Sequence, residues 1–281
     1  MGRRSKVMVA FVVLVVVVLL GFFLVPSTVT RKFSRIEQDF RATLAPSQGL
    51  FTLEDLADKP QAVRNFFIKG GYIGKPKMSG LKAVFEKADF SLGQGKDWVV
   101  ITYTQLNGAE QPLRYAQILS SIHHLPFEGL DSYAQGVGAM EGYLAKFFRL
   151  FNQKGEHMDR ACLVTYLAEA FFLPSVALSP LIEWEELSAL EVKATIRAFG
   201  MEGSGVFTFA ETGEMLSFTT DDRMAAGFDG SLQKVRWTAA CSDYRSVEGL
   251  SVPSTLKATW HYPEGDLPYF DGKDVKISYL Y

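Results

Sequence analysis

The sequence predicts an α+β protein: an N-terminal transmembrane helix, then one large curved antiparallel sheet, a half-barrel of roughly ten strands wrapped around inserted helices. Three observations lead to this prediction. The C-terminal two thirds of the chain reads as strands joined by short Gly- or Pro-containing turns, which pair antiparallel. Few helical segments are available to cover such a sheet, so we expect it to curl around them. An unbroken apolar run stands near the start of the chain.

The apolar run extends from Val7 to Val25, 19 residues without a charged or hydrogen-bonding side chain. A helix rises about 1.5 Å per residue, so this run spans about 30 Å, the thickness of a bilayer's hydrocarbon core. A cleaved signal peptide has a shorter apolar region followed by small residues at a cleavage site. Here Pro26 and Ser27 follow instead. We therefore expect residues 7–25 to be an uncleaved anchor that contacts membrane lipid.

Basic residues flank the apolar run on both sides, within Arg3–Lys6 and Arg31–Arg35. The first group touches the apolar boundary directly, which favours a cytoplasmic N-terminal tail of residues 1–6. Long C-terminal domains also cross a membrane largely regardless of their charge. We expect a single-pass protein of the bacterial cytoplasmic membrane, with its domain on the extracytoplasmic side.

The composition bounds the classes of function. About 250 residues follow the anchor, enough for one large domain with a full core; we assign residues 26–57 to a connector and 58–281 to the domain. The net charge of −2 gives no basic surface for nucleic acid. The two cysteines, Cys162 and Cys241, either pair or stay as separate buried thiols. No spacing of Cys and His predicts a metal, and no motif predicts a cofactor.

Four helices are expected in the connector and the domain. Apolar residues at three- and four-residue spacing predict an amphipathic helix over Phe33–Leu44. A second helix starts after Pro60 and stops at Gly70-Gly71. Further along, the stripe Met140–Phe151 predicts a third helix, closed by Gly155. Asp159 then caps a fourth, which ends before Pro174.

Strands fill most of the remainder. Four are expected before the third helix, at 82–91, 97–106, 113–124 and 128–137. In the last third, apolar and polar residues alternate, which is typical of strands with one dry face. These segments are Leu190–Ala198, a hairpin over 203–220, Val235–Cys241, Leu256–Tyr262 and Val275–Tyr281.

Several short motifs stand out over residues 60–281: Asp131-Ser132-Tyr133, Tyr166-Leu167-Ala168-Glu169, Phe172-Leu173-Pro174, Arg223 after paired aspartates, and Asp243-Tyr244-Arg245. Together they resemble a family of uncharacterised bacterial membrane-anchored proteins. Thr165 and Phe172 depart from the pattern, because a basic residue and a tryptophan are expected there. The family has no established activity, so the resemblance implies a domain and no reaction. The order of strands and helices also resembles the lipoprotein-carrier (Lol-type) half-barrel, which shelters acyl chains.

No motif supplies a nucleophile, a base and an orienting group together. Glu169 lies near an apolar stripe, so if it is buried it needs a partner, for which Arg223 is a candidate. Such a pair would bind a polar head group while aromatic residues hold a tail. We expect a membrane-tethered domain that binds a lipid or other apolar ligand without catalysis. The expected ligand-binding residues are Tyr133, Tyr166, Glu169, Phe172, Arg223, Trp237 and Trp260.

Two other functions share these features. One is a structural or protein-interaction component of the cell envelope, whose interior is filled by its own side chains and whose partner is unknown. The other is a hydrolase that uses Glu169 or Asp131 as a base. An empty apolar interior of several hundred Å³, the size of a typical ligand site, would favour binding over scaffolding.

Overall fold

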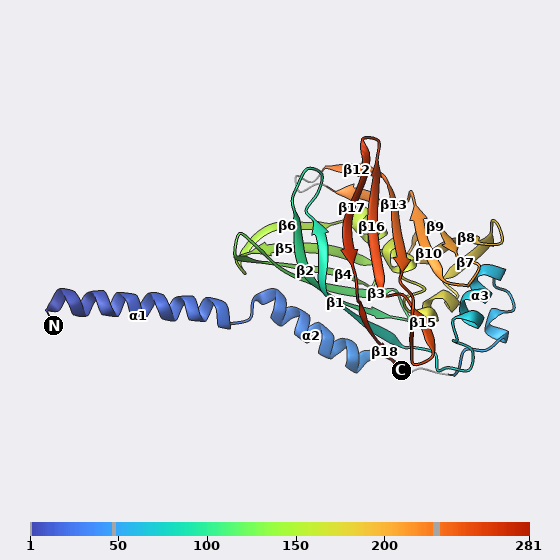
Figure 1. Cartoon of the computed structure of the whole chain (residues 1–281), viewed down its shortest axis with the longest axis horizontal. Helices are drawn as coiled ribbons and strands as arrows, with labels where there is room; N and C mark the ends of the chain where they lie inside the picture. Colours follow the sequence, from blue (N-terminus) through green and yellow to red (C-terminus); the bar gives the residue numbers. More distant parts are fainter. Residues whose placement is uncertain (1, 47–48, 227–230) are drawn as a thin grey trace.

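The computed structural model describes residues 2–46, 49–226 and 231–281, without the side chains at 3–6, 18–19 and 23. Within these residues one antiparallel sheet of 14 strands dominates the molecule (Figure 1). Its strand order is β6-β5-β4-β3-β2-β1-β17-β16-β13-β10-β9-β8-β7, and β18 pairs with β1. The predicted class is confirmed, with more strands than expected.

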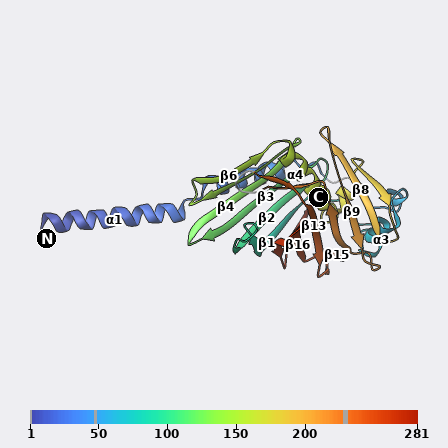
Figure 2. The same ribbon diagram turned by 90° about the horizontal axis from the view of Figure 1, so that it is seen from above.

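Helix α1 (Arg3–Leu24) extends away from the sheet (Figures 1 and 2). It contains the predicted anchor, of which positions 18, 19 and 23 lie outside the described side chains. Among the described residues, no helix meets the length and hydropathy that crossing a membrane requires.

Helix α2 (Thr28–Thr43) is the predicted amphipathic helix, and it begins where Ser27 Oγ accepts the backbone N–H of Thr30. Its apolar side packs on the outer face of the sheet, where Phe33 and Phe40 share a small core with Leu106 and Leu130. Part of the predicted connector thus packs on the sheet, and the domain boundary at residue 58 stays a prediction.

The N-terminal half of the sheet is a run of hairpins. Two of their turns place consecutive non-glycine residues at positive φ, His123-His124 and Ala145-Lys146. The first is a two-residue turn, the kind whose backbone twist matches that of the flanking strands, and the second has three residues, 145–147. The strands are β1 (Gly80–Ser91), β2 (Trp98–Gly108), β3 (Leu113–Ile122), β4 (Leu125–Ala134), β5 (Val137–Leu144) and β6 (Phe148–Lys154).

The helix predicted over Met140–Phe151 is wrong, because this segment is the hairpin β5–β6. Its helical spacing of apolar residues arises from two strands joined by a short turn, with one register shift between Gly142 and Tyr143. A Cβ at Gly142 would lie 2.3 Å from the Phe151 ring, so the ring needs this glycine in the neighbouring strand. Glycines at 138 and 142 were the signal against a helix.

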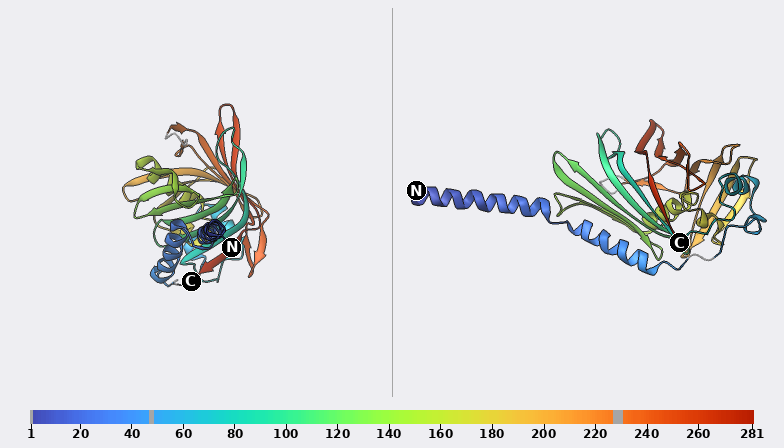
Figure 3. Two further views of the ribbon diagram at one scale, coloured as in Figure 1. Left: turned by 90° about the vertical axis from the view of Figure 1, so that its left-hand side faces the viewer. Right: turned by 60° about the horizontal axis from the view of Figure 1, so that its bottom comes forward.

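Helix α4 (Glu156–Ala168) lies inside the curve of the sheet, and the two ends of the sheet close on it (Figure 3). It packs against β4–β6 on one side and β8–β9 on the other. Two glycines allow this close approach: a Cβ at Gly138 would lie 2.7 Å from the Met158 carbonyl oxygen, and one at Gly203 would lie 2.5 Å from Val164. The helix starts before Asp159, whose carboxylate accepts the Gly138 N–H instead of capping.

The C-terminal half confirms the alternation predicted from sequence. On β8, Val192, Ala194 and Ile196 are buried; on β13 and β16, Trp237 pairs with Trp260 and Ala239 with Ala258. The strands are β7 (Ile182–Glu186), β8 (Glu191–Ala198), β9 (Met201–Phe209), β10 (Met215–Thr220), β11 (Met224–Ala226), β12 (Leu232–Lys234), β13 (Arg236–Ser242), β14 (Arg245–Val247), β15 (Leu250–Val252), β16 (Thr255–Tyr262), β17 (Gly265–Gly272) and β18 (Lys276–Leu280). Single-turn helices η1 (Glu54–Leu56) and η2 (Pro174–Leu178) and the predicted helix α3 (Gln61–Lys69) complete the chain.

Candidate ligand-binding site

A buried arginine on β3 organises a polar network on the inner face of the sheet. Arg114 Nε donates to both carboxylate oxygens of Glu169, at 3.1 and 3.0 Å, and its Nη2 donates to the Tyr103 hydroxyl at 2.6 Å. Its Nη1 donates to Asp131, also at hydrogen-bond distance. Asn107 Nδ2 completes the shell around Glu169, at 2.7 Å. Burying a charge is costly unless it is paired and hydrogen-bonded, and each of these charges is.

The predicted Glu169–Arg223 pair is therefore wrong, because Arg114 is the partner of Glu169. Glu169 ends α4, and β3 brings Arg114 to it from across the sheet. The signal for Arg114 was in the sequence. Arg114 is two and four residues before Ala116 and Ile118, so it lies on the same dry face of the strand as they do.

Arg223 lies instead on an aromatic wall. Its guanidinium carbon is 4.2 Å from the centre of the Trp237 ring and 5.2 Å from that of Trp260. Trp237 Nε1 donates to the Tyr269 hydroxyl at 3.0 Å, which fixes the indole beneath the cation. Three of the predicted ligand-binding residues thus come together, from the segment after β10 and from β13 and β16.

The Arg223 Nε and Nη1 atoms are buried and have no hydrogen-bond partner among the described residues. Stacking on tryptophan stabilises a cation but satisfies none of its N–H donors. A guanidinium presents these donors in a planar fork that matches a carboxylate or a phosphate. Arg223, Trp237 and Trp260 together form a candidate anion site against an apolar surface.

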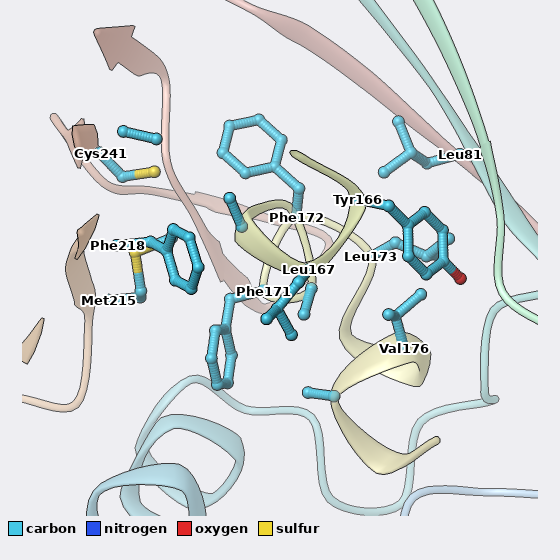
Figure 4. Close-up of a cluster of buried hydrophobic side chains, with 14 of the residues drawn as sticks. Leu81, Tyr166, Leu167, Phe171, Phe172, Leu173, Val176, Met215, Phe218 and Cys241 are labelled. Carbon is cyan, nitrogen blue, oxygen red and sulfur yellow. The ribbon is translucent and has the colours of Figure 1, made fainter. Parts of the chain in front are cut away.

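The other predicted residues are part of the packed interior. Tyr166 donates its hydroxyl to the Gly108 carbonyl at 2.8 Å, and Phe172 lies in the same buried cluster (Figure 4). The ring of Tyr133 is fully buried beside Phe199, and burial raises the pKa of its phenol. Its hydroxyl has no hydrogen-bond partner among the described residues. Tyr166 and Phe172 therefore support the fold and do not line the Arg223 site.

Cys162 lies beside the polar network. Its Sγ lies 3.9 Å from Asp131 Oδ1. Burial, reinforced by the Asp131 charge, raises the pKa of the thiol well above its usual range, against smaller opposite effects of Arg114 and Arg223. Both arginines thus act on one side chain of α4. Neutral at physiological pH, this thiol is a poor nucleophile. In the described part of the chain, no cluster of His, Cys, Asp and Glu has metal-binding geometry.

One small hollow lies away from these residues, between α3 and the β9–β10 turn. It holds about 60 Å³ and is lined in part by Phe66, Lys69 and Glu214. Ligand sites for drug-sized molecules measure about 300–1,000 Å³, so this hollow is too small for an acyl chain.

The curved sheet, the inner helix and the charged interior define a half-barrel α+β domain. Residues 49–272 match the model of a family of unknown function, DUF6544, and the chain belongs to that family. No curated protein matches the chain. Among solved structures it is similar to a LolA superfamily protein from Nitrosomonas europaea, with 10% identity over 76% of this chain and 92% of that chain and a TM-score of 0.41.

Proposed function

We propose that this protein is a membrane-tethered, extracytoplasmic domain whose half-barrel binds a lipid or another amphiphile with an anionic head, without chemistry on it. The observation that carries the proposal is the Arg223 guanidinium, stacked on two tryptophans, whose buried Nε and Nη1 atoms have no hydrogen-bond partner among the described residues. The tether is residues 7–25, an apolar stretch long enough to span a bilayer.

The surroundings of Arg223 favour an amphiphile over a small polar anion. Trp237 and Trp260 face each other across neighbouring strands and continue through Tyr269 to Phe90, a row of rings with centres 6.1–6.5 Å apart. Such a row offers a long apolar contact beside a cation. An anionic head would hydrogen-bond to the guanidinium while its chain lies on the rings.

The network beneath argues against catalysis by an acidic residue. Glu169 and Asp131, the two candidate bases, both contact Arg114. The thiol near Asp131 is held in its neutral form by burial. A general base must reach the proton that it removes, and these carboxylates are occupied by the arginine.

Binding is testable by tryptophan quenching. The full chain, held in a lipid-free amphipathic polymer, is titrated with dibromostearate and with its uncharged methyl ester. We expect saturable quenching by the carboxylate and weaker binding of the ester. The variant Arg223→Gln should lose about tenfold or more in affinity for the carboxylate, the effect of one charged hydrogen bond, and little for the ester.

Arg236→Gln is the matched control. This exposed arginine begins β13 and pairs with Asp221 on the surface, so its loss should leave both affinities unchanged. Equal loss in the two variants, or quenching of wild type that never saturates, contradicts the proposal.

A second candidate is a structural component of the envelope, and the packed interior favours it. Under β7–β10 the space is filled by Phe171, Phe207, Phe209 and Phe218, all fully buried. The ring of Phe171 contacts those of both Phe207 and Phe209 edge-on, at distances of 4.9 and 5.0 Å between ring centres. Any ligand must therefore lie in the other half of the curve, near Arg223, and failure of the titration leaves this second candidate.

A further inference from the structure

The C-terminal end of α1 is fastened to the turn between β5 and β6. Lys146 Nζ donates to the carbonyl oxygens of Phe22 and Val25, acceptors that the end of a helix leaves open. The ammonium also lies 5.2 Å from the centre of the Phe22 ring. Phe22 in turn packs edge-on against Phe147, at 6.2 Å between ring centres. The hairpin tip is thus level with the last turn of α1.

This tip carries exposed apolar side chains where a soluble surface would carry polar ones. Phe147 and Phe148 are 63% and 62% exposed, and their rings lie 4.8 Å apart. Leu150 on β6 and Leu125, at the start of the neighbouring strand, extend the surface. Large exposed apolar clusters mark interaction sites. We call Leu125, Phe147, Phe148 and Leu150 the apolar tip.

The apolar tip shares an edge of the sheet with the anion site. In an antiparallel sheet alternate strand ends meet at one edge, which collects the turns at 92–97, 123–124 and 145–147. The same edge runs on across β17, β16 and β13 to the C-terminal end of β10. Arg223 follows soon after this end.

We infer that the apolar tip inserts into the interface of the bilayer that holds α1, so that the edge bearing Arg223 faces the lipid. This inference rests on the proposed tether, since the end of a spanning helix lies at the boundary between hydrocarbon and head groups. Phe and Leu are the residues that interfacial elements bury there. Amphiphiles would then exchange between the leaflet and the half-barrel without crossing water.

The charge around the apolar tip fits a lipid surface. Arg31 and Arg35 on α2 are exposed directly after the end of α1, and Arg149 is exposed on β6 beside the tip. Basic groups next to a membrane element attract anionic head groups. An apolar tip ringed by cations is the pattern expected of a bilayer contact.

Insertion is measured by depth-dependent quenching of a single label. Both native cysteines are buried, so a cysteine at Phe148→Cys takes an environment-sensitive fluorophore selectively. Val137→Cys is the matched control, because Val137 is 63% exposed at a hairpin turn on the opposite edge. Each labelled full chain is reconstituted into phosphatidylcholine–phosphatidylglycerol vesicles with or without nitroxide-labelled acyl chains.

We expect the nitroxide lipid to quench the label at 148 at least twofold and to leave the label at 137 unchanged. Equal quenching at both positions overturns the inference, and so does a label at 148 that is shielded from water yet unquenched, as beneath a protein partner. Alkaline carbonate separates the two proposals. If the protein stays in the vesicles after the carbonate wash but the label at 148 is unquenched, only the inserted tip is disproved. If the wash releases the protein, the tether is disproved as well.

Discussion

Arg114 is the residue on which the interior charges depend. It faces Glu169 and Asp131 with one guanidinium, and its own pKa is raised by these carboxylates and Tyr103 against the effect of burial. Such a network as a whole contributes little to the free energy of unfolding. Removing one member is costly, because the remaining charges stay buried without a partner. The arginine thus fixes the end of α4 to β3 and β4.

The variant Arg114→Met tests this dependence. Methionine fills similar space but leaves Glu169 and Asp131 without their cation, so we expect a loss of about 3–5 kcal/mol in the free energy of unfolding. Urea unfolding followed by circular dichroism measures the loss. The control Arg197→Met removes an exposed arginine that pairs with Glu183 and Glu202, for which about 0–1 kcal/mol is expected. A loss as small as that of the control contradicts the proposed dependence.

The two cysteines give a prediction in pH. Burial raises the pKa of both thiols, that of Cys162 and that of Cys241, so the folded state favours the neutral form. Their contribution to stability is complete below the unfolded pKa of about 8.5 and is lost as the pH rises above it, by about 1.4 kcal/mol per pH unit for each thiol.

The double variant Cys162→Ala, Cys241→Ala should therefore lose less stability than wild type between pH 8.5 and 10. The difference between the two slopes isolates the thiols from the tyrosines and lysines that titrate in the same range. If the free energy of unfolding falls equally steeply with pH in wild type and in the double variant, the prediction is wrong. At pH 8, thiol reagents should label wild type only after it unfolds.

At the scale of elements, α4 is held between the two ends of the sheet by contacts that only glycine permits. A Cβ at Gly203 on β9 would meet Val164 Cγ2 at 2.5 Å. Val164 is β-branched and fully buried, so it has little freedom to move away.

We expect Gly203→Ala to cost about 1–3 kcal/mol, the usual effect of overpacking. Val164→Ala removes the opposing methyl groups, and in the double variant the two changes should compensate in part. A double-mutant cycle of unfolding free energies measures this coupling. Additive losses would show that α4 and β9 are not in the contact described.

The same scale explains what the sequence predicted and what it did not. Alternation over Leu190–Ala198 and Leu256–Tyr262 identified the inner face, because one side of each strand is dry. The segment Met140–Phe151 misled, because two short strands with a register shift imitate a helical stripe. Of the site, Arg223, Trp237 and Trp260 were among the expected ligand-binding residues, and the structure brings these three together; that they bind a ligand stays a prediction. The partner of Glu169 was not predicted, because pairing across the sheet is a tertiary fact.

At the scale of the whole molecule, the orientation of the edge that carries Arg223 follows from where α1 ends. Lys146 donates to the carbonyl oxygens of Phe22 and Val25 at the end of α1, and α2 then continues along the outer face of the sheet, where Phe33 and Phe40 pack (Figure 1). The half-barrel thereby contacts the N-terminal helices at both its edge and its back. If α1 is the proposed tether, these contacts determine how the half-barrel approaches the bilayer.

This attachment makes the side of the membrane decisive. A protein that receives lipid outside the cytoplasm must have its C-terminus there, so alkaline phosphatase joined after Tyr281 should be active in intact bacterial cells, and a fused cytosolic reporter should be inactive. Replacing Arg3, Arg4 and Lys6 by Ser leaves the basic group after residue 25 dominant, so a share of the chains should invert and phosphatase activity should fall. An active cytosolic reporter on the unaltered chain would place the half-barrel against the wrong leaflet and remove the proposed function with it.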